Sequence, residues 1–115
     1  MLSIWPKATY FRARDEGWSD RDIRALLADH GMRVHDADAV VRWIGPDDPG
    51  PPYFEEMLEA DVFTAAEALG APYVNALLTG RRAHVTLEAA AESLADLCDR
   101  AATRGMGVTV EFATR

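Results

Sequence analysis

Apolar residues recur at steps of three and four along the last third of the chain, and they then alternate with polar residues up to Phe112. The first spacing predicts an amphipathic helix, because residues three and four apart share one face. Thr86 is the expected N-cap and Gly105 the expected C-terminal glycine. The apolar stripe consists of Leu87, Ala90, Leu94, Leu97, Cys98 and Ala101.

The alternating positions that follow predict a strand over residues 108–112. Val108, Val110 and Phe112 lie on one side, and Thr109 and Glu111 on the other. Glu111 is the residue to explain, because a carboxylate near the carboxyl end of a strand fed by a helix is where α/β proteins place their chemistry.

The same order of helix, glycine and strand occurs twice earlier in the chain. Ser19 is the expected N-cap of a helix that ends at His30 and Gly31, with a strand over residues 32–36. The proline-rich run 45–52 is expected to be a loop. The next helix spans residues 54–69, ends at Gly70 and leads to the strand Tyr73–Leu78. Before Ser19 no helix is predicted, and residues 2–5 are at most the tail of a strand.

Short connections between helices and strands predict an α/β fold with parallel strands joined by right-handed crossovers. At 115 residues the chain is expected to form a single domain over residues 1–115. A sheet of three strands has two open edges, which must be covered, extended by a partner or closed into a barrel.

Composition narrows the possible partners. A net charge of −7 argues against sequence-independent nucleic-acid binding, which depends on neutralising phosphates. No apolar run has the length of a membrane span, and the N-terminus lacks the pattern of a signal peptide, so we expect a cytoplasmic protein with no membrane partner. Cys98 lies on the predicted apolar stripe and is expected to be a buried small hydrophobe.

Polar residues at three predicted strand ends are candidates for chemistry, because the carboxyl ends of parallel strands meet at one rim. Carboxylate, imidazole and amide groups suit Mg²⁺ or Mn²⁺. The alternative is that the aspartates and the asparagine form turns and that Glu111 faces solvent. The rim candidates are His35, Asp36, Asp38, Asn75 and Glu111, and Arg42, Arg81 and Arg82 are candidate anion contacts.

Common signatures are missing from the sequence. It contains no GxGxxG after a strand, no GxxxxGK[ST], no HExxH, no paired CxxC and no GxSxG. Dinucleotide-binding, nucleotide-triphosphate-binding and zinc-protease functions are therefore not expected.

Three segments together resemble the xylose-isomerase-like TIM-barrel family of sugar phosphate isomerases and epimerases. They are ARDEGWSDRDIRALLADHGMRVHDADAVVRW, FTAAEALGAPYVNALLTG and LADLCDRAATRGMGVTVEF. The resemblance extends from about Phe11 to Phe112 and corresponds to the second to fourth βα units. It implies a partial (β/α) barrel that acts on a sugar or sugar phosphate.

The resemblance assigns roles to individual residues. Glu111 stands where the family has a ligand of a divalent metal, Mn²⁺ or Mg²⁺, that is often also an acid/base carboxylate. His35 and Asn75 fall at strand ends that line the sugar pocket and are implied substrate contacts. The other metal ligands of the family come from later strands, so the isolated chain is expected to be incomplete and inactive.

Two alternatives remain open. One is a non-enzymatic α/β module that self-associates into a homo-oligomer through its exposed sheet edges. The other is a small acidic binding domain that holds a ligand with Trp5, Tyr10, Trp18 and Trp43, although so few aromatic residues more often belong to a core.

Overall fold

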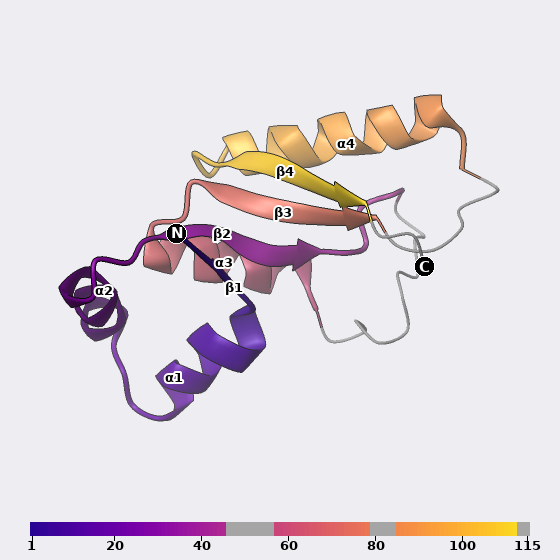
Figure 1. Cartoon of the computed structure of the whole chain (residues 1–115). Coiled ribbons are helices and arrows are strands. Elements are labelled where there is room, and N and C mark those ends of the chain that lie inside the picture. The colour runs from indigo at the N-terminus through magenta and orange to yellow at the C-terminus, as the bar shows by residue number, and fades with distance from the viewer. Residues whose placement is uncertain (46–56, 79–84, 113–115) are drawn as a thin grey trace.

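The structure, a computed structural model, describes residues 1–45, 57–78 and 85–112. In these residues parallel strands alternate with helices (Figure 1). The strands are β1 (Leu2–Ile4), β2 (Val34–Val40), β3 (Tyr73–Leu78) and β4 (Gly107–Phe112). The helices are the π-helix η1 (Pro6–Phe11), α1 (Arg12–Asp15), α2 (Asp20–Asp29), α3 (Glu59–Leu69) and α4 (Leu87–Ala102).

The strands form one four-stranded sheet in the order β1-β2-β3-β4, and every neighbouring pair is parallel. The α/β class is confirmed, but the prediction of three strands is wrong. The tail suggested at residues 2–5 is a paired edge strand, β1. Within the described residues the sheet is open, with β1 and β4 at its edges.

Helices α3 and α4 pack side by side on one face of the sheet. The Arg100 guanidinium on α4 donates to both carboxylate oxygens of Glu59 on α3, at 2.9 and 2.8 Å. Just beyond the end of α4, Arg104 pairs with Glu67 of α3 at 2.7 Å. These contacts help to set the relative position of the two helices. They add little to the free energy of unfolding, because both pairs are partly exposed.

The core lies between these helices and the sheet. Ala37, Val74 and Ala76 of the central strands meet Ala65 and Ala66 of α3 with no exposed surface. Small residues on both sides allow the helix to approach the sheet closely. Leu97 and Ala101 of α4 join the same cluster, as do Tyr10 of η1 and Trp43 after β2.

Several predicted elements are confirmed. Ser19 caps α2 by accepting from the Asp22 amide at 3.1 Å, and Thr86 caps α4 by accepting from the Ala89 amide at 3.1 Å. Gly70 ends α3 in the left-handed conformation, with φ of 69°. Strand β3 has the predicted bounds.

Other predictions need correction. The strand placed over residues 32–36 begins and ends later, at Val34 and Val40, because the chain needs residues 30–33 to turn from α2 into the sheet. The start of the helix predicted over 54–69 and the loop beyond Gly45 fall outside the described residues, and α3 itself begins at Glu59. Residues 6–15 are helical although no helix was expected there.

Cys98 is exposed, so the prediction that it is buried is wrong. Only part of the predicted apolar stripe on α4 is buried. Leu97 and Ala101 are enclosed, whereas Leu87 at the start of the helix is 82% exposed. Helical spacing gives the face that is apolar but does not say how much of that face has a neighbour.

None of the helices in the described ranges has the length and apolar character needed to cross a membrane.

Candidate functional site

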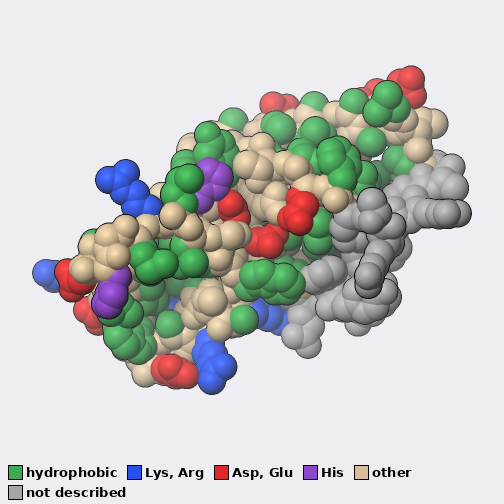
Figure 2. All heavy atoms as spheres, in the orientation of Figure 1, with side chains coloured by type: hydrophobic (Ala, Val, Ile, Leu, Met, Phe, Trp, Pro, Cys, Tyr) green, Lys and Arg blue, Asp and Glu red, His purple; other side chains and the backbone are tan. Residues whose placement is uncertain are grey.

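The two faces of the sheet differ in chemistry. One face carries the alanines and valines that pack on α3 and α4. The opposite face carries Asp36 and Asp38 of β2, Asn75 of β3, and Thr109 and Glu111 of β4. In the described part of the chain no helix crosses this second face (Figure 1). Figure 2 shows acidic side chains gathered over the middle of the sheet on the side turned to the viewer.

The strand register brings these side chains together. Asp38 is level with Asn75, and Asn75 is level with Thr109. Glu111 is one step further along β4, opposite Leu77. Residues two apart on a strand share a face, so Glu111 and Thr109 lie on the same side as Asn75.

Asn75 is the centre of this cluster. Its amide nitrogen donates to Asp38 Oδ1 at 2.9 Å and to Glu111 Oε2 at 2.9 Å. Its carbonyl oxygen accepts from Thr109 Oγ1 at 2.9 Å. The side chain is only 9% exposed, and a buried amide must satisfy its donors. Asn75 therefore holds a carboxylate from each neighbouring strand in a fixed place.

The pKa of Asp38 is raised above its ordinary value. Burial of the carboxyl group is the main cause, and the charges of Glu111 and Asp36 add to it. The hydrogen bond from Asn75 opposes the shift, because it favours the ionised form. The Asp38 carboxyl group therefore binds its proton more tightly than an ordinary aspartate does.

A second group lies at the β1 side of the same face. Ser3 Oγ and His35 Nδ1 both contact the Asp36 carboxylate, the histidine at 2.9 Å. The His35 ring also lies against Tyr73, with centroids 5.1 Å apart. Asp36 lies between the serine and the histidine, so the serine hydroxyl donates its hydrogen bond to the carboxylate and not to the imidazole. This order differs from a nucleophilic triad, in which the imidazole contacts the hydroxyl.

A β-bulge produces this arrangement. Leu2 pairs with Val34 and Ser3 with Asp36, so β2 has one extra residue, His35, between the two pairs. The extra residue lets His35 and Asp36, adjacent in sequence, both reach partners on the open face.

Most of the residues predicted to lie at the rim of the sheet lie within its strands. His35, Asp36 and Asp38 lie within β2 and Asn75 lies within β3, rather than after these strands. Only Glu111, next to last in β4, is near a strand end. The predicted proximity is met for Asp38, Asn75 and Glu111, which are in contact, and His35 and Asp36 form the separate group.

Among the described residues no group of three or more histidine, cysteine, aspartate or glutamate side chains is placed to hold an ion. In addition, the Asn75 amide hydrogens lie between the Asp38 and Glu111 oxygens, where a shared cation would need acceptors. A metal at Glu111 would require ligands from elsewhere and a rearranged Asn75.

Some contacts were not found from the sequence. Ser3 donates a hydrogen bond to Asp36 in the second group, and Thr109 donates one to Asn75 in the first group. Their only signal is the two-residue alternation of a strand, which becomes useful once the register is known. Of the arginines suggested as anion contacts, Arg42 lines a cavity of about 430 Å³ with Glu59, Asp96 and Arg100. Arg81 and Arg82 lie outside the described residues.

The aromatic residues do not form one binding surface. Tyr10 and Trp43 are buried in the core, and the Trp43 indole donates to the Leu77 carbonyl at 3.0 Å. Trp5 and Trp18 are 48% and 41% exposed.

A scan of protein families found none that matches this chain, and a search of curated proteins found no similar sequence.

Proposed function

We propose that this chain forms part of a (β/α) barrel of the sugar phosphate isomerase and epimerase type, and that its polar sheet face is the barrel interior. Strands that follow one another in sequential order through right-handed crossovers place their helices on one side. A doubly wound sheet reverses its strand order and covers both faces. The order β1-β2-β3-β4 has no such reversal among the described strands.

The observation that carries the proposal is the contact of Asn75 with Asp38 and Glu111. A barrel interior near a catalytic site holds polar side chains from several strands, fixed by one another. Asp38, Asn75 and Glu111 come from three consecutive strands and are fixed in this way. Carboxylates in such an array accept hydrogen bonds from sugar hydroxyls, and a carboxyl pair exchanges protons with neighbouring carbons of a ketose or aldose.

Each residue has a distinct place in the proposal. Glu111, which is exposed, is the acid/base carboxylate and contributes to any metal site completed by residues outside the described ranges. Asp38 is the partner carboxyl, since its pKa is raised. Asn75 positions the Asp38 and Glu111 carboxylates. To contact substrate, its amide must give up one of its present hydrogen bonds. His35 contacts substrate from the second group.

The purified chain is expected to bind ketoses or ketose phosphates weakly and to show no turnover with Mn²⁺ or Mg²⁺. Glu111→Gln should weaken binding about threefold to tenfold, because one hydrogen bond to a charged group is lost. Calorimetry measures the binding, and an isomer-resolving assay measures the turnover.

Glu92→Gln on the exposed side of α4 is the matched control and should bind as the wild type does. Equal binding by Glu111→Gln, or no sugar binding at all, would contradict the proposed site. Clear turnover would contradict the expectation that the isolated chain is inactive.

A second candidate function is self-association through the sheet edges. Among the described residues β4 has no partner on its outer side, and it presents Phe112, which is 74% exposed. An edge strand with exposed apolar side chains is a template for another chain.

Light scattering after size exclusion should then show a dimer or larger assembly, which Phe112→Lys on the edge strand should weaken at least about tenfold. Leu26→Lys, on the exposed surface of α2, serves as the control for an added charge. A wild-type chain that stays monomeric at high concentration excludes this candidate.

A further inference from the structure

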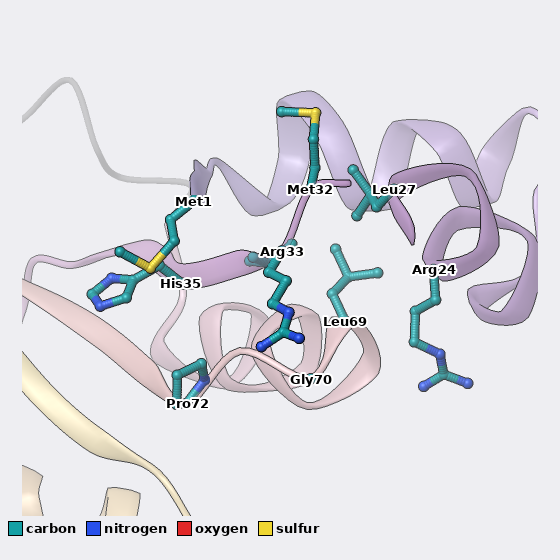
Figure 3. Close-up of a pocket in the computed structure, with 10 residues that line it drawn as sticks. Met1, Arg24, Leu27, Met32, Arg33, His35, Leu69, Gly70 and Pro72 are labelled. Carbon is teal, nitrogen blue, oxygen red and sulfur yellow. The ribbon is translucent and has the colours of Figure 1, made fainter. Parts of the chain in front are cut away.

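A cavity of about 450 Å³ lies at the amino ends of β2 and β3, beside α2 and the end of α3 (Figure 3). It is formed by the segments that lead into the strands, away from Glu111 near the carboxyl end of β4. A cavity of this volume accommodates a small organic molecule.

The charged side chains that line the cavity have one sign. They are Arg24 from α2 and Arg33 before β2, and no carboxylate is among the described residues that line it. The whole chain carries 19 acidic against 12 basic residues, so this local excess of basic groups runs against the composition. A pocket lined by one sign of charge concentrates ligands of the opposite sign.

The donors are available to a ligand. In the described part of the structure the Arg33 guanidinium has no hydrogen-bond or ion-pair partner. Figure 3 shows its side chain extending over Gly70 and toward Pro72.

Arg24 has a different part. One of its guanidinium nitrogens donates to the Ala68 carbonyl at 2.9 Å. That carbonyl belongs to the last turn of α3, whose negative end would otherwise repel an anion. Arg24 therefore offsets the helix end.

Most of the other residues that line the cavity are apolar. They include Leu27 of α2, Met32 before β2 and Leu69 at the end of α3. Figure 3 shows Leu27 and Leu69 on the side of the cavity toward Arg24, with Met32 beside them. Apolar walls with a few polar groups are the usual composition of a small-molecule site.

We propose that this cavity binds a small organic anion, a carboxylate or phosphate monoester that carries an apolar group. Arg33 contacts the anionic group, and Leu27, Met32 and Leu69 contact the apolar group. The proposal is independent of the sugar site, because Asp38, Glu111 and His35 are not among these contacts.

The probes are octanoate and octyl phosphate, measured by calorimetry with the full chain below the concentration at which they form micelles. Octanol tests the charge, and inorganic phosphate tests the apolar group. We expect at least one of the two anions to bind at least about tenfold more tightly than octanol and than inorganic phosphate, the contribution of one charge-assisted hydrogen bond or a few buried methylenes. Which anion binds more tightly distinguishes a carboxylate ligand from a phosphate ligand.

Arg33→Gln should weaken binding of the preferred anion about tenfold, whereas Arg21→Gln, which removes the same charge from an exposed position of α2 outside the cavity, should leave it unchanged. Circular dichroism checks that both variants are folded, and Arg33 is exposed, so its replacement does not disturb the core. Octanol binding as tight as the anions, equal loss in the Arg21→Gln control, wild-type binding by Arg33→Gln, or no binding of either anion would each overturn the proposal.

Discussion

Leu97→Ala is expected to lower the free energy of unfolding by about 2–5 kcal/mol, the range for truncating an enclosed leucine. The Leu97 side chain is fully buried and belongs to the cluster that joins α4 to α3 and the sheet. Its removal leaves a cavity between α4, α3 and the sheet, and the cost depends on how far the surrounding side chains can collapse into it. Urea unfolding followed by circular dichroism measures the change.

Leu87→Ala on the same helix provides the comparison. Leu87 is 82% exposed, so the same truncation should change the free energy of unfolding by less than about 0.5 kcal/mol. Similar losses in the two variants would mean that α4 does not pack on the sheet through Leu97. A large loss in Leu87→Ala alone would place the buried face of α4 on the side that is exposed here.

The elements that sequence reasoning found are those with strong local signals. The caps at Ser19 and Thr86 and the glycine at the end of α3 each act within a few residues, so the chain itself shows them. The exposure of Cys98 and Leu87 has no local signal, because it depends on which neighbours α4 has. The strand start at Val34 also depends on pairing with β1, a strand of three residues that gives little pattern.

The sequence predicted which residues form the candidate site, but it predicted the wrong positions for them on the sheet. The sequence placed Asp38, Asn75 and Glu111 at the ends of three strands, from the rule that ligands gather there. In the structure they meet across the face of the sheet, because β2 extends to Val40 and brings Asp38 level with Asn75. The bulge at His35 and the contributions of Ser3 and Thr109 follow only from register, which no single strand specifies.

Asn75→Asp is expected to lower the free energy of unfolding by about 2–4 kcal/mol near pH 7, because two donors are lost and a third carboxylate is placed between Asp38 and Glu111. Asn75 is almost enclosed, so water cannot replace the lost bonds fully. The loss should shrink near pH 4, where protonated carboxyl groups can donate in place of the amide. Asn75→Leu separates the two causes, since it removes the donors without adding charge and its cost should vary little with pH.

The pH dependence of the wild type gives the same site an independent test. The pKa of Asp38 is raised in the folded protein above its ordinary value of 3.8, so the folded state binds its proton more tightly than the unfolded state does. The stability contributed by Asp38 is therefore fully present below 3.8 and is lost as the pH rises through the raised value. Asp38→Asn removes this titration, so the difference in unfolding free energy between variant and wild type should move in favour of the variant as the pH increases. A difference that stays constant across this range would show that Asp38 titrates alike in the folded and unfolded chains. The burial of Asp38 beside the charges of Glu111 and Asp36, which raises its pKa, would then not be formed in solution.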